Sequence, residues 1–96
     1  MASARFDWDP EKDAENQQKH RVSFGRARYA LADARRVIAK DVSHSQTEER
    51  FHCFGEVDGG VLAMRFTYRA SVIRMIGAGY WRTGKAAYER EKKLHK

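Results

Sequence analysis

Two short turn segments divide the stretch from residue 51 to residue 76 into three runs rich in apolar and β-branched residues. The first two runs, 51–57 and 61–69, flank Asp58-Gly59-Gly60, in which the glycines permit the positive φ that a two-residue hairpin turn requires. Ala70-Ser71 separates the second run from the third. We therefore expect a meander of at least three antiparallel strands.

The register of these hairpins decides which side chains share a face of the sheet. A turn at Gly59-Gly60 pairs Asp58 with Val61. A turn at Ala70-Ser71 continues the same alternation into the third run. The expected apolar pairs are Val57–Leu62, Gly55–Met64, Cys53–Phe66, Tyr68–Ile73 and Phe66–Met75. Both hairpins direct these side chains to one face, which we expect to form the core.

The opposite face of the expected sheet is basic. Its cross-strand neighbours in this register are His52 with Thr67 and Arg74, Arg65 with Phe54, and Arg69 with Arg50. Like charges on adjacent strands repel unless an anion lies between them, and planar guanidinium donors match phosphate oxygens. We therefore interpret this face as an RNA-binding surface, on which Phe54 and either Tyr80 or Trp81 stack bases. The alternative is a solvated sheet face that simply holds long polar side chains.

Helical signals precede and follow these runs. Asp9 is typical of an N-cap, and the helical pattern that starts after it ends at Lys19-His20. Ser23 is a second N-cap candidate, because apolar residues at helical spacing follow it. Residues 36–42 are strand-like, and Thr83 can cap a C-terminal helix.

These elements predict an α+β fold of residues 1–96 as one domain, with two N-terminal helices and a C-terminal helix packed on an antiparallel sheet of about four strands. A chain of 96 residues is too short for a second core. Its longest apolar run is about four residues, so no membrane-spanning helix is expected. The N-terminus turns acidic where a secretory signal would be apolar, which favours a cytoplasmic protein.

Charge and ligand spacing limit the function further. The net charge is +6, from 19 Lys and Arg against 13 Asp and Glu, and residues 61–96 carry 9 basic and 2 acidic side chains. A basic surface favours nucleic acid as a partner and, second, an acidic protein. The histidines and Cys53 lack metal-ligand spacing, and no nucleotide-binding glycine motif is present, so neither a metal nor a cofactor is expected.

RNA can be cleaved without a metal when its 2′-hydroxyl attacks the adjacent phosphorus. Such a site needs a base for the hydroxyl proton, cations for the phosphorane and an acid for the leaving oxygen. Glu49 or a histidine can serve as the base, and a histidine or Tyr80 as the acid. Arg50, Arg65 and Arg74 can hold the phosphate.

Several short segments spread over about residues 6–90 form one recognisable set. They are Phe6-Asp-Trp8-Asp9, Lys12, Asn16-Gln-Gln-Lys19-His20 with Val22-Ser23-Phe24 and Ala27, Glu49-Arg50-Phe51 with Gly55, Leu62 with Thr67, and Ile73-Arg74-Met-Ile76 with Ala78. This set resembles the BrnT toxins of type II toxin–antitoxin modules. The resemblance implies a RelE-like fold and a ribonuclease activity that arrests translation in the host bacterium. It also implies inhibition by a BrnA-type antitoxin in a two-plus-two assembly, which binds operator DNA only through the antitoxin.

A few positions depart from that family pattern. Many members carry Ser and Arg where this chain has Gly77 and Gly79, so a hydroxyl and a cation are missing. Either Arg82 reaches back in compensation or the chain is a weakened nuclease. Arg21 replaces the glycine that usually follows the Lys-His pair, so we expect the first helix to end without a left-handed glycine cap.

The residues and the resemblance together predict a metal-independent RNA endonuclease. The residues expected to be catalytic are Lys19, His20, Glu49, Arg50, Thr67, Arg74 and Arg82. The residues expected to bind RNA are His52, Phe54, Arg65, Arg69, Tyr80, Trp81 and Lys85. Two alternatives are a non-catalytic nucleic-acid binder and a module whose basic face only docks an acidic partner.

Overall fold

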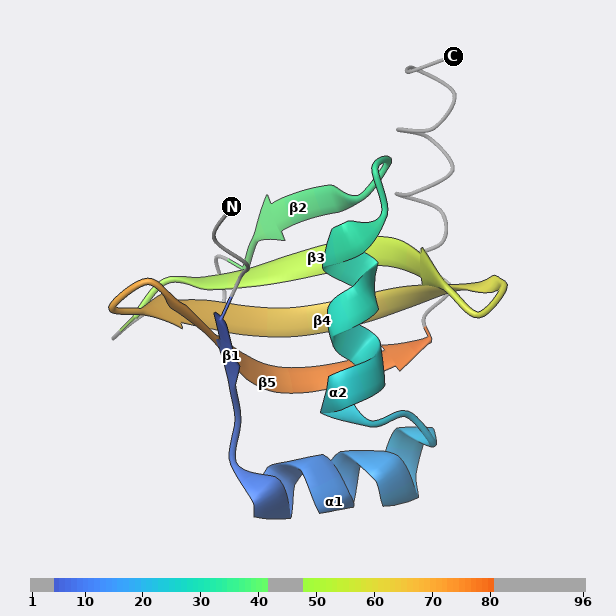
Figure 1. Cartoon of the computed structure of the whole chain (residues 1–96), viewed down its shortest axis with the longest axis horizontal. Coiled ribbons are helices and arrows are strands. Elements are labelled where there is room, and N and C mark those ends of the chain that lie inside the picture. The colour runs from blue at the N-terminus through green and yellow to red at the C-terminus, as the bar shows by residue number, and fades with distance from the viewer. Residues whose placement is uncertain (1–4, 42–47, 81–96) are drawn as a thin grey trace.

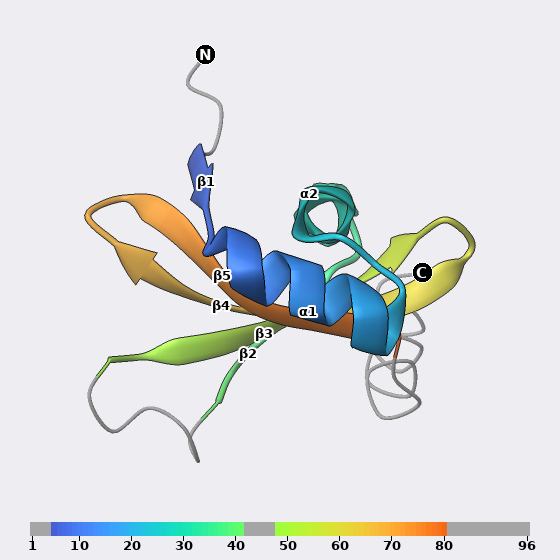
Figure 2. The ribbon, with the colours of Figure 1, turned by 90° about the horizontal axis from the view of Figure 1, so that it is seen from below.

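A five-stranded sheet with helices on one side and along one edge forms the described part of the chain, residues 5–41 and 48–80 of a computed structural model (Figure 1). The elements are β1 (Arg5–Asp7), α1 (Pro10–His20), α2 (Phe24–Ala27), the 3-10 helix η1 (Arg28–Ala32), β2 (Val37–Lys40), β3 (Arg50–Val57), β4 (Gly60–Arg69) and β5 (Val72–Tyr80). The strand order is β1-β5-β4-β3-β2. α2 and η1 cross one face of the sheet, whereas α1 runs alongside β5 (Figures 1 and 2).

The α+β class is confirmed, but the prediction of about four antiparallel strands is wrong. β1 adds a fifth strand that pairs in parallel with β5, with Phe6 opposite Ile73, so the sheet is mixed. Three residues are too few to show the alternation by which a strand is read from sequence. The C-terminal helix predicted after Thr83 lies outside the described residues.

The first hairpin turns one residue earlier than predicted. Its turn residues are Asp58 and Gly59, with φ of 53° and 83°, and Val57 pairs with Gly60. Every cross-strand partner therefore moves by two residues, so that Gly55 lies opposite Leu62 and not Met64. Because side chains alternate with period two, a shift of two leaves each face with the same members. The predicted division into an apolar and a basic face thus holds despite the wrong turn.

The second hairpin follows the predicted register as far as a β-bulge. Phe66 pairs with Met75, whereas Arg65 pairs with Gly77, so Ile76 is an extra residue in β5. The bulge interrupts the in-and-out alternation of β5. The residues of β5 after the bulge therefore face the opposite side of the sheet from the one they would face in a strand without a bulge. Ala78 consequently joins the buried core, which is built from these residues: Val22, Phe24, Ala27, Ala30, Cys53, Val57, Leu62, Met64, Phe66, Met75 and Ala78.

The two ends of α1 are capped by polar groups. Asp9 accepts a hydrogen bond from the amide of Glu11 at 2.9 Å, as expected of the N-cap. At the other end Arg21 adopts the left-handed conformation, with φ of 58°, and its amide donates to the carbonyl of Gln17 at 2.9 Å. The helix therefore keeps a left-handed cap although the residue is not glycine.

The Asn16 side chain joins α1 to two other segments. It is only 8% exposed, and its Nδ2 donates to the carbonyl of Val22 at 2.9 Å. Its Oδ1 accepts from the amide of Ala78 at 3.1 Å, in the part of β5 that β1 does not reach. Asp13 accepts from the amide of Phe24 at 2.8 Å, which adds a second tie between α1 and the start of α2. These bonds give the Asn-x-x-Lys-His-x-Val-Ser-Phe segment a structural role.

Close contact between β3 and η1 requires a glycine at position 55. A β-carbon on Gly55 would stand 2.3 Å from the carbonyl oxygen of Ala30, which is backbone and cannot move aside alone. We expect Gly55→Ala to lower the free energy of unfolding by about 2–3 kcal/mol or more. Gly25→Ala is the matched control, because its β-carbon would meet no atom closer than 4.0 Å and alanine favours a helix. Equal unfolding midpoints of the two variants in denaturant titrations would contradict this packing.

Candidate active site

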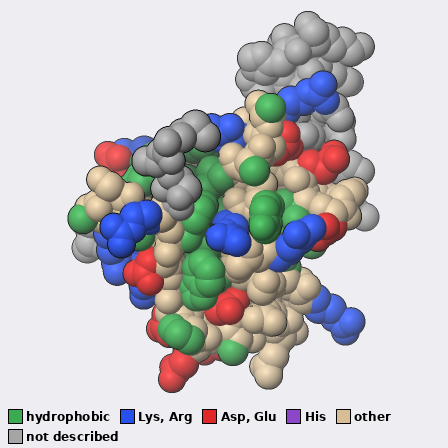
Figure 3. All heavy atoms as spheres, viewed as in Figure 1, with side chains coloured by type: hydrophobic (Ala, Val, Ile, Leu, Met, Phe, Trp, Pro, Cys, Tyr) green, Lys and Arg blue, Asp and Glu red, His purple; other side chains and the backbone are tan. Residues whose placement is uncertain are grey.

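The sheet face that points away from α2 and η1 carries most of the predicted site residues. Alternation and cross-strand pairing place these side chains there, and we call this surface the basic face: Arg50, His52, Phe54, Arg65, Thr67, Arg69 and Arg74. On the opposite side of the molecule, Lys and Arg side chains are spread among other types (Figure 3). The basic face is therefore the surface on which an anionic ligand is expected to bind.

Neighbours on the basic face differ from the predicted ones because of the earlier turn. The predicted pairs that the structure does not form are His52–Thr67, Arg65–Phe54 and Arg69–Arg50. Thr67 lies between Arg50 and Arg74, and His52 lies opposite Arg65. The correct register thus brings a histidine and an arginine together at the middle of the face.

Carboxylates of the protein itself balance one end of the basic face. Both nitrogens of the Arg69 fork bind Glu48, at 3.2 and 3.3 Å, and Arg74 binds Asp7 at 2.6 Å. The hydrogen bond from Arg69 and then the charges of Arg69, Arg50 and Arg74 hold the pKa of Glu48 below its usual value. The repulsion expected between these arginines is therefore relieved without a ligand.

Thr67 and Glu49 connect the start of β3 to β4. Thr67 is 1% exposed, and its hydroxyl donates to the carbonyl of Glu49 at 2.6 Å. The Glu49 carboxylate is exposed and lies 3.5 Å from the Lys40 ammonium of β2. Thr67 is therefore a buried structural group in this arrangement, and the Glu49 carboxylate is directed toward the edge of the sheet.

His20, His52 and Arg65 line one small cavity of about 50 Å³. They come from α1, β3 and β4, and the remaining lining residues are Asn16, Ala63, Gly77 and Ala78. His52 also stacks on Phe54, with ring centroids 5.8 Å apart and planes within 5°. Within the described residues, no acidic side chain pairs with Arg65. Two imidazoles and a guanidinium therefore share a confined space.

The placement of α1 and the glycine at position 77 bring His20, His52 and Arg65 to one cavity. Asn16 holds α1 against β5 through Ala78, and His20 follows four residues later on the same side of the helix. On the sheet, the guanidinium of Arg65 lies across Gly77, where a β-carbon would stand 3.1 Å from Nη2. The absence of a side chain at position 77 thus leaves the space that the Arg65 guanidinium uses.

Comparison with protein families gives a match over most of the chain. The model for "Ribonuclease toxin, BrnT, of type II toxin-antitoxin system" matches residues 8–84. The chain belongs to the BrnT family. This BrnT protein is accordingly a ribonuclease toxin of a type II toxin–antitoxin system, with an antitoxin as its partner. Comparison with curated proteins gives no match.

Other residues predicted for the BrnT site lie apart from the cavity. Lys19 is exposed on α1, next to His20. Tyr80 lies on the other side of the sheet, where its hydroxyl donates to the carbonyl of Val57 at 3.2 Å. Trp81, Arg82 and Lys85 lie outside the described residues. Asn16 was not predicted as a site residue, although a polar residue four positions before His20 is a signal for it.

No group of three or more His, Cys, Asp and Glu side chains is placed to hold a metal ion among residues 5–41 and 48–80. Within the same residues, no helix is long and apolar enough to cross a membrane.

Cys53 is fully buried on the core side of β3, and burial raises the pKa of its thiol to about 12. The thiol is therefore not a nucleophile at neutral pH.

We expect Cys53 to resist iodoacetamide in the native protein at about pH 8, because only the thiolate reacts and burial disfavours it. Intact-mass spectrometry should show one added group only after unfolding in denaturant. Rapid alkylation of the folded protein, with unchanged circular dichroism, would contradict the burial of this thiol.

Proposed function

We propose that this BrnT protein is a metal-independent RNA endonuclease whose reaction takes place at the cavity of His20, His52 and Arg65. The observation that supports this proposal is that one cavity is lined by two groups able to exchange protons and one fixed cation. Metal-free RNA cleavage needs this combination, since a proton must be taken up, a proton must be given and a phosphorane must be stabilised.

In the proposed reaction one imidazole takes the proton of a 2′-hydroxyl, and that oxygen bonds to the adjacent phosphorus. Arg65 donates hydrogen bonds to the phosphoryl oxygens as negative charge develops on them. The second imidazole, in its protonated form, donates its proton to the leaving 5′-oxygen as the phosphorus–oxygen bond breaks. The products are a 2′,3′-cyclic phosphate and a 5′-hydroxyl. Either histidine can take either role in this scheme.

The remaining predicted residues take supporting roles in the proposal. Arg50, Arg69 and Arg74 contact phosphates beyond the scissile one, and Arg69 and Arg74 exchange their carboxylate partners for RNA when it binds. Lys19 attracts the RNA backbone beside His20. Glu49 remains the alternative base, although its carboxylate lies near Lys40.

The cellular part of the proposal rests on the family. We expect the protein to act as one domain in the cytoplasm, to inhibit translation by cutting RNA, and to be neutralised by a BrnA-type antitoxin. The expected complex has two copies of each chain and binds operator DNA only through the antitoxin.

The site is tested with antitoxin-free protein and a radiolabelled RNA. We expect His20→Ala, His52→Ala and Arg65→Ala each to lower the single-turnover cleavage rate by about 100-fold or more. Arg35→Ala is the charge-matched control, because Arg35 is exposed and lines neither this cavity nor the basic face. A parent protein that binds RNA without cutting it would instead select the non-catalytic binder. Unchanged rates in the three cavity variants would show that the reaction occurs elsewhere.

Gly77→Val gives a second test that leaves Arg65 in the sequence. Its side chain would occupy the space of the Arg65 guanidinium, which is the mobile end of a long side chain and can move away without disturbing the backbone. We expect a loss of cleavage close to that of Arg65→Ala, with the thermal midpoint retained. Full activity of this variant would contradict the placement of Arg65.

Metal independence has its own measurement. We expect the parent to cleave RNA at the same rate in excess EDTA as in Mg²⁺, and to leave termini that a cyclic-phosphate-specific ligase accepts. Loss of cleavage in EDTA that added metal restores would overturn this part of the proposal.

A further inference from the structure

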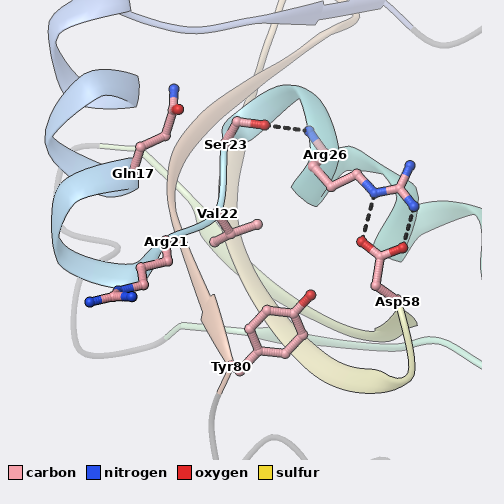
Figure 4. Close-up of a pocket in the computed structure, with 7 residues that line it drawn as sticks. All are labelled: Gln17, Arg21, Val22, Ser23, Arg26, Asp58 and Tyr80. Carbon is pink, nitrogen blue, oxygen red and sulfur yellow. Dashed lines mark hydrogen bonds and ion pairs between the residues drawn. The ribbon is translucent and has the colours of Figure 1, made fainter.

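A second and larger cavity of about 370 Å³ lies on the other side of β5 (Figure 4). We call it the tyrosine pocket, and its lining residues are Gln17, Arg21, Val22, Ser23, Arg26, Asp58 and Tyr80. Cavities that hold a nucleotide-sized molecule begin at about 300 Å³. The tyrosine pocket is thus large enough for one nucleotide, whereas the cavity of Arg65 admits little more than a phosphate.

The two cavities are adjacent along the chain. At the C-terminal end of α1, Asn16 and His20 line the first cavity, and Gln17 and the C-cap Arg21 line the tyrosine pocket. Neighbouring Cα atoms are 3.8 Å apart, so the last two turns of α1 form a wall shared by both cavities. β5 also contributes to both, with Gly77 and Ala78 lining the first cavity and Tyr80 lining the tyrosine pocket. A strand of RNA that enters the first cavity can continue over the end of α1 into the tyrosine pocket.

The tyrosine ring is fixed before any ligand binds. Its hydroxyl donates to the carbonyl of Val57, and its ring carbons lie so close to Gly60 that a β-carbon there would stand 3.0 Å away. The side chain of Tyr80 is nevertheless 47% exposed. An exposed aromatic ring held in one orientation is a stacking platform for a base of any identity.

The charges of the tyrosine pocket favour an anion at its rim. Arg26 and Asp58 form a two-point ion pair at one side of the pocket (Figure 4), so their charges compensate each other. The side chain of Arg21 starts at the end of α1 on the rim of the pocket and points outward, away from Tyr80 (Figure 4). Within the described residues it pairs with no acidic group. The net charge of the residues that line the tyrosine pocket is therefore positive. The side-chain amide of Gln17 adds a hydrogen-bond donor and an acceptor.

We infer that the tyrosine pocket binds the nucleotide of single-stranded RNA next to the scissile phosphate, with its base against Tyr80 and its phosphate at Arg21. This inference rests on the proposed function, because the cavity of His20, His52 and Arg65 is taken as the place of cleavage. It adds a binding subsite that the chemistry of cleavage alone does not require.

The probe is a fluorescent 2′-O-methyl RNA oligonucleotide, which lacks the attacking hydroxyl and stays intact during the measurement. We expect Tyr80→Ala to raise its dissociation constant about 10-fold or more, and Tyr80→Phe, which keeps the ring, to change it less than about twofold. Gln17→Ala should weaken binding, whereas Gln18→Ala is the matched control, because this exposed neighbour lines neither cavity. Arg21→Gly removes the charge with a residue suited to the positive φ, and should weaken binding most at low salt.

The outcomes separate the subsite from the proposed function. If the parent cuts no RNA but the Tyr80 and Gln17 variants still weaken binding, the endonuclease proposal fails and the subsite stands. If the parent cuts RNA and all of these variants bind like the parent, the subsite is wrong. Retained RNA binding in Tyr80→Ala with loss of antitoxin binding would also overturn it, since the pocket would then receive a protein. Should Tyr80→Ala fail to fold, Gln17→Ala against Gln18→Ala decides.

Discussion

The side-chain amide of Asn16 joins α1 to β5 and to the segment between α1 and α2. β5 is the neighbour of β1 for only three residues, and beyond them its edge needs another partner. Asn16 supplies an acceptor to that edge and a donor to the chain after α1. A buried amide with both ends satisfied is stabilising, whereas one lost partner would leave a costly unpaired group. The position of α1, and with it of His20, follows from these two bonds.

The basic face shows how a protein can gather arginines and still fold. At one end Glu48 and Asp7 compensate Arg69 and Arg74, so the folded chain carries its own counter-ions. At the centre Arg65 has no such partner within the described residues, and it is there that the two histidines converge. The surface is therefore divided into a part that is neutralised and a part that offers charge to a ligand. Net charge alone would not have distinguished them.

Much of the fold could be predicted from the sequence, because its signals are local. Asp9 and Ser23 cap helices as expected, and the hairpins sort apolar and basic side chains correctly. The predicted turn lies one residue too late, because Asp58-Gly59 and Gly59-Gly60 are both pairs that a two-residue hairpin turn accepts. Each side chain still lies on the predicted face of the sheet, but its neighbours on the adjacent strand differ from the predicted ones. Neighbours across a sheet depend on register, and register was set by a single turn residue.

Other features depend on contacts between distant segments and have no local signal. The pairing of β1 with β5, the extra residue at Ile76 and the left-handed Arg21 are decided by tertiary packing. The shared cavity of His20 and His52 also has no local signal, because it forms only when α1 lies along β5. Sequence reasoning proposed both histidines for the site, but could not place them in one cavity.

The bulge at Ile76 also decides which residue of β5 lies opposite Arg65. If the same sequence paired with β4 without an extra residue, Ile76 would stand opposite Arg65, Gly77 would turn toward the core and Ala78 away from it. The bulge instead places a residue without a side chain beneath the guanidinium. An irregularity in one strand thus creates the room that a cation on the neighbouring strand occupies.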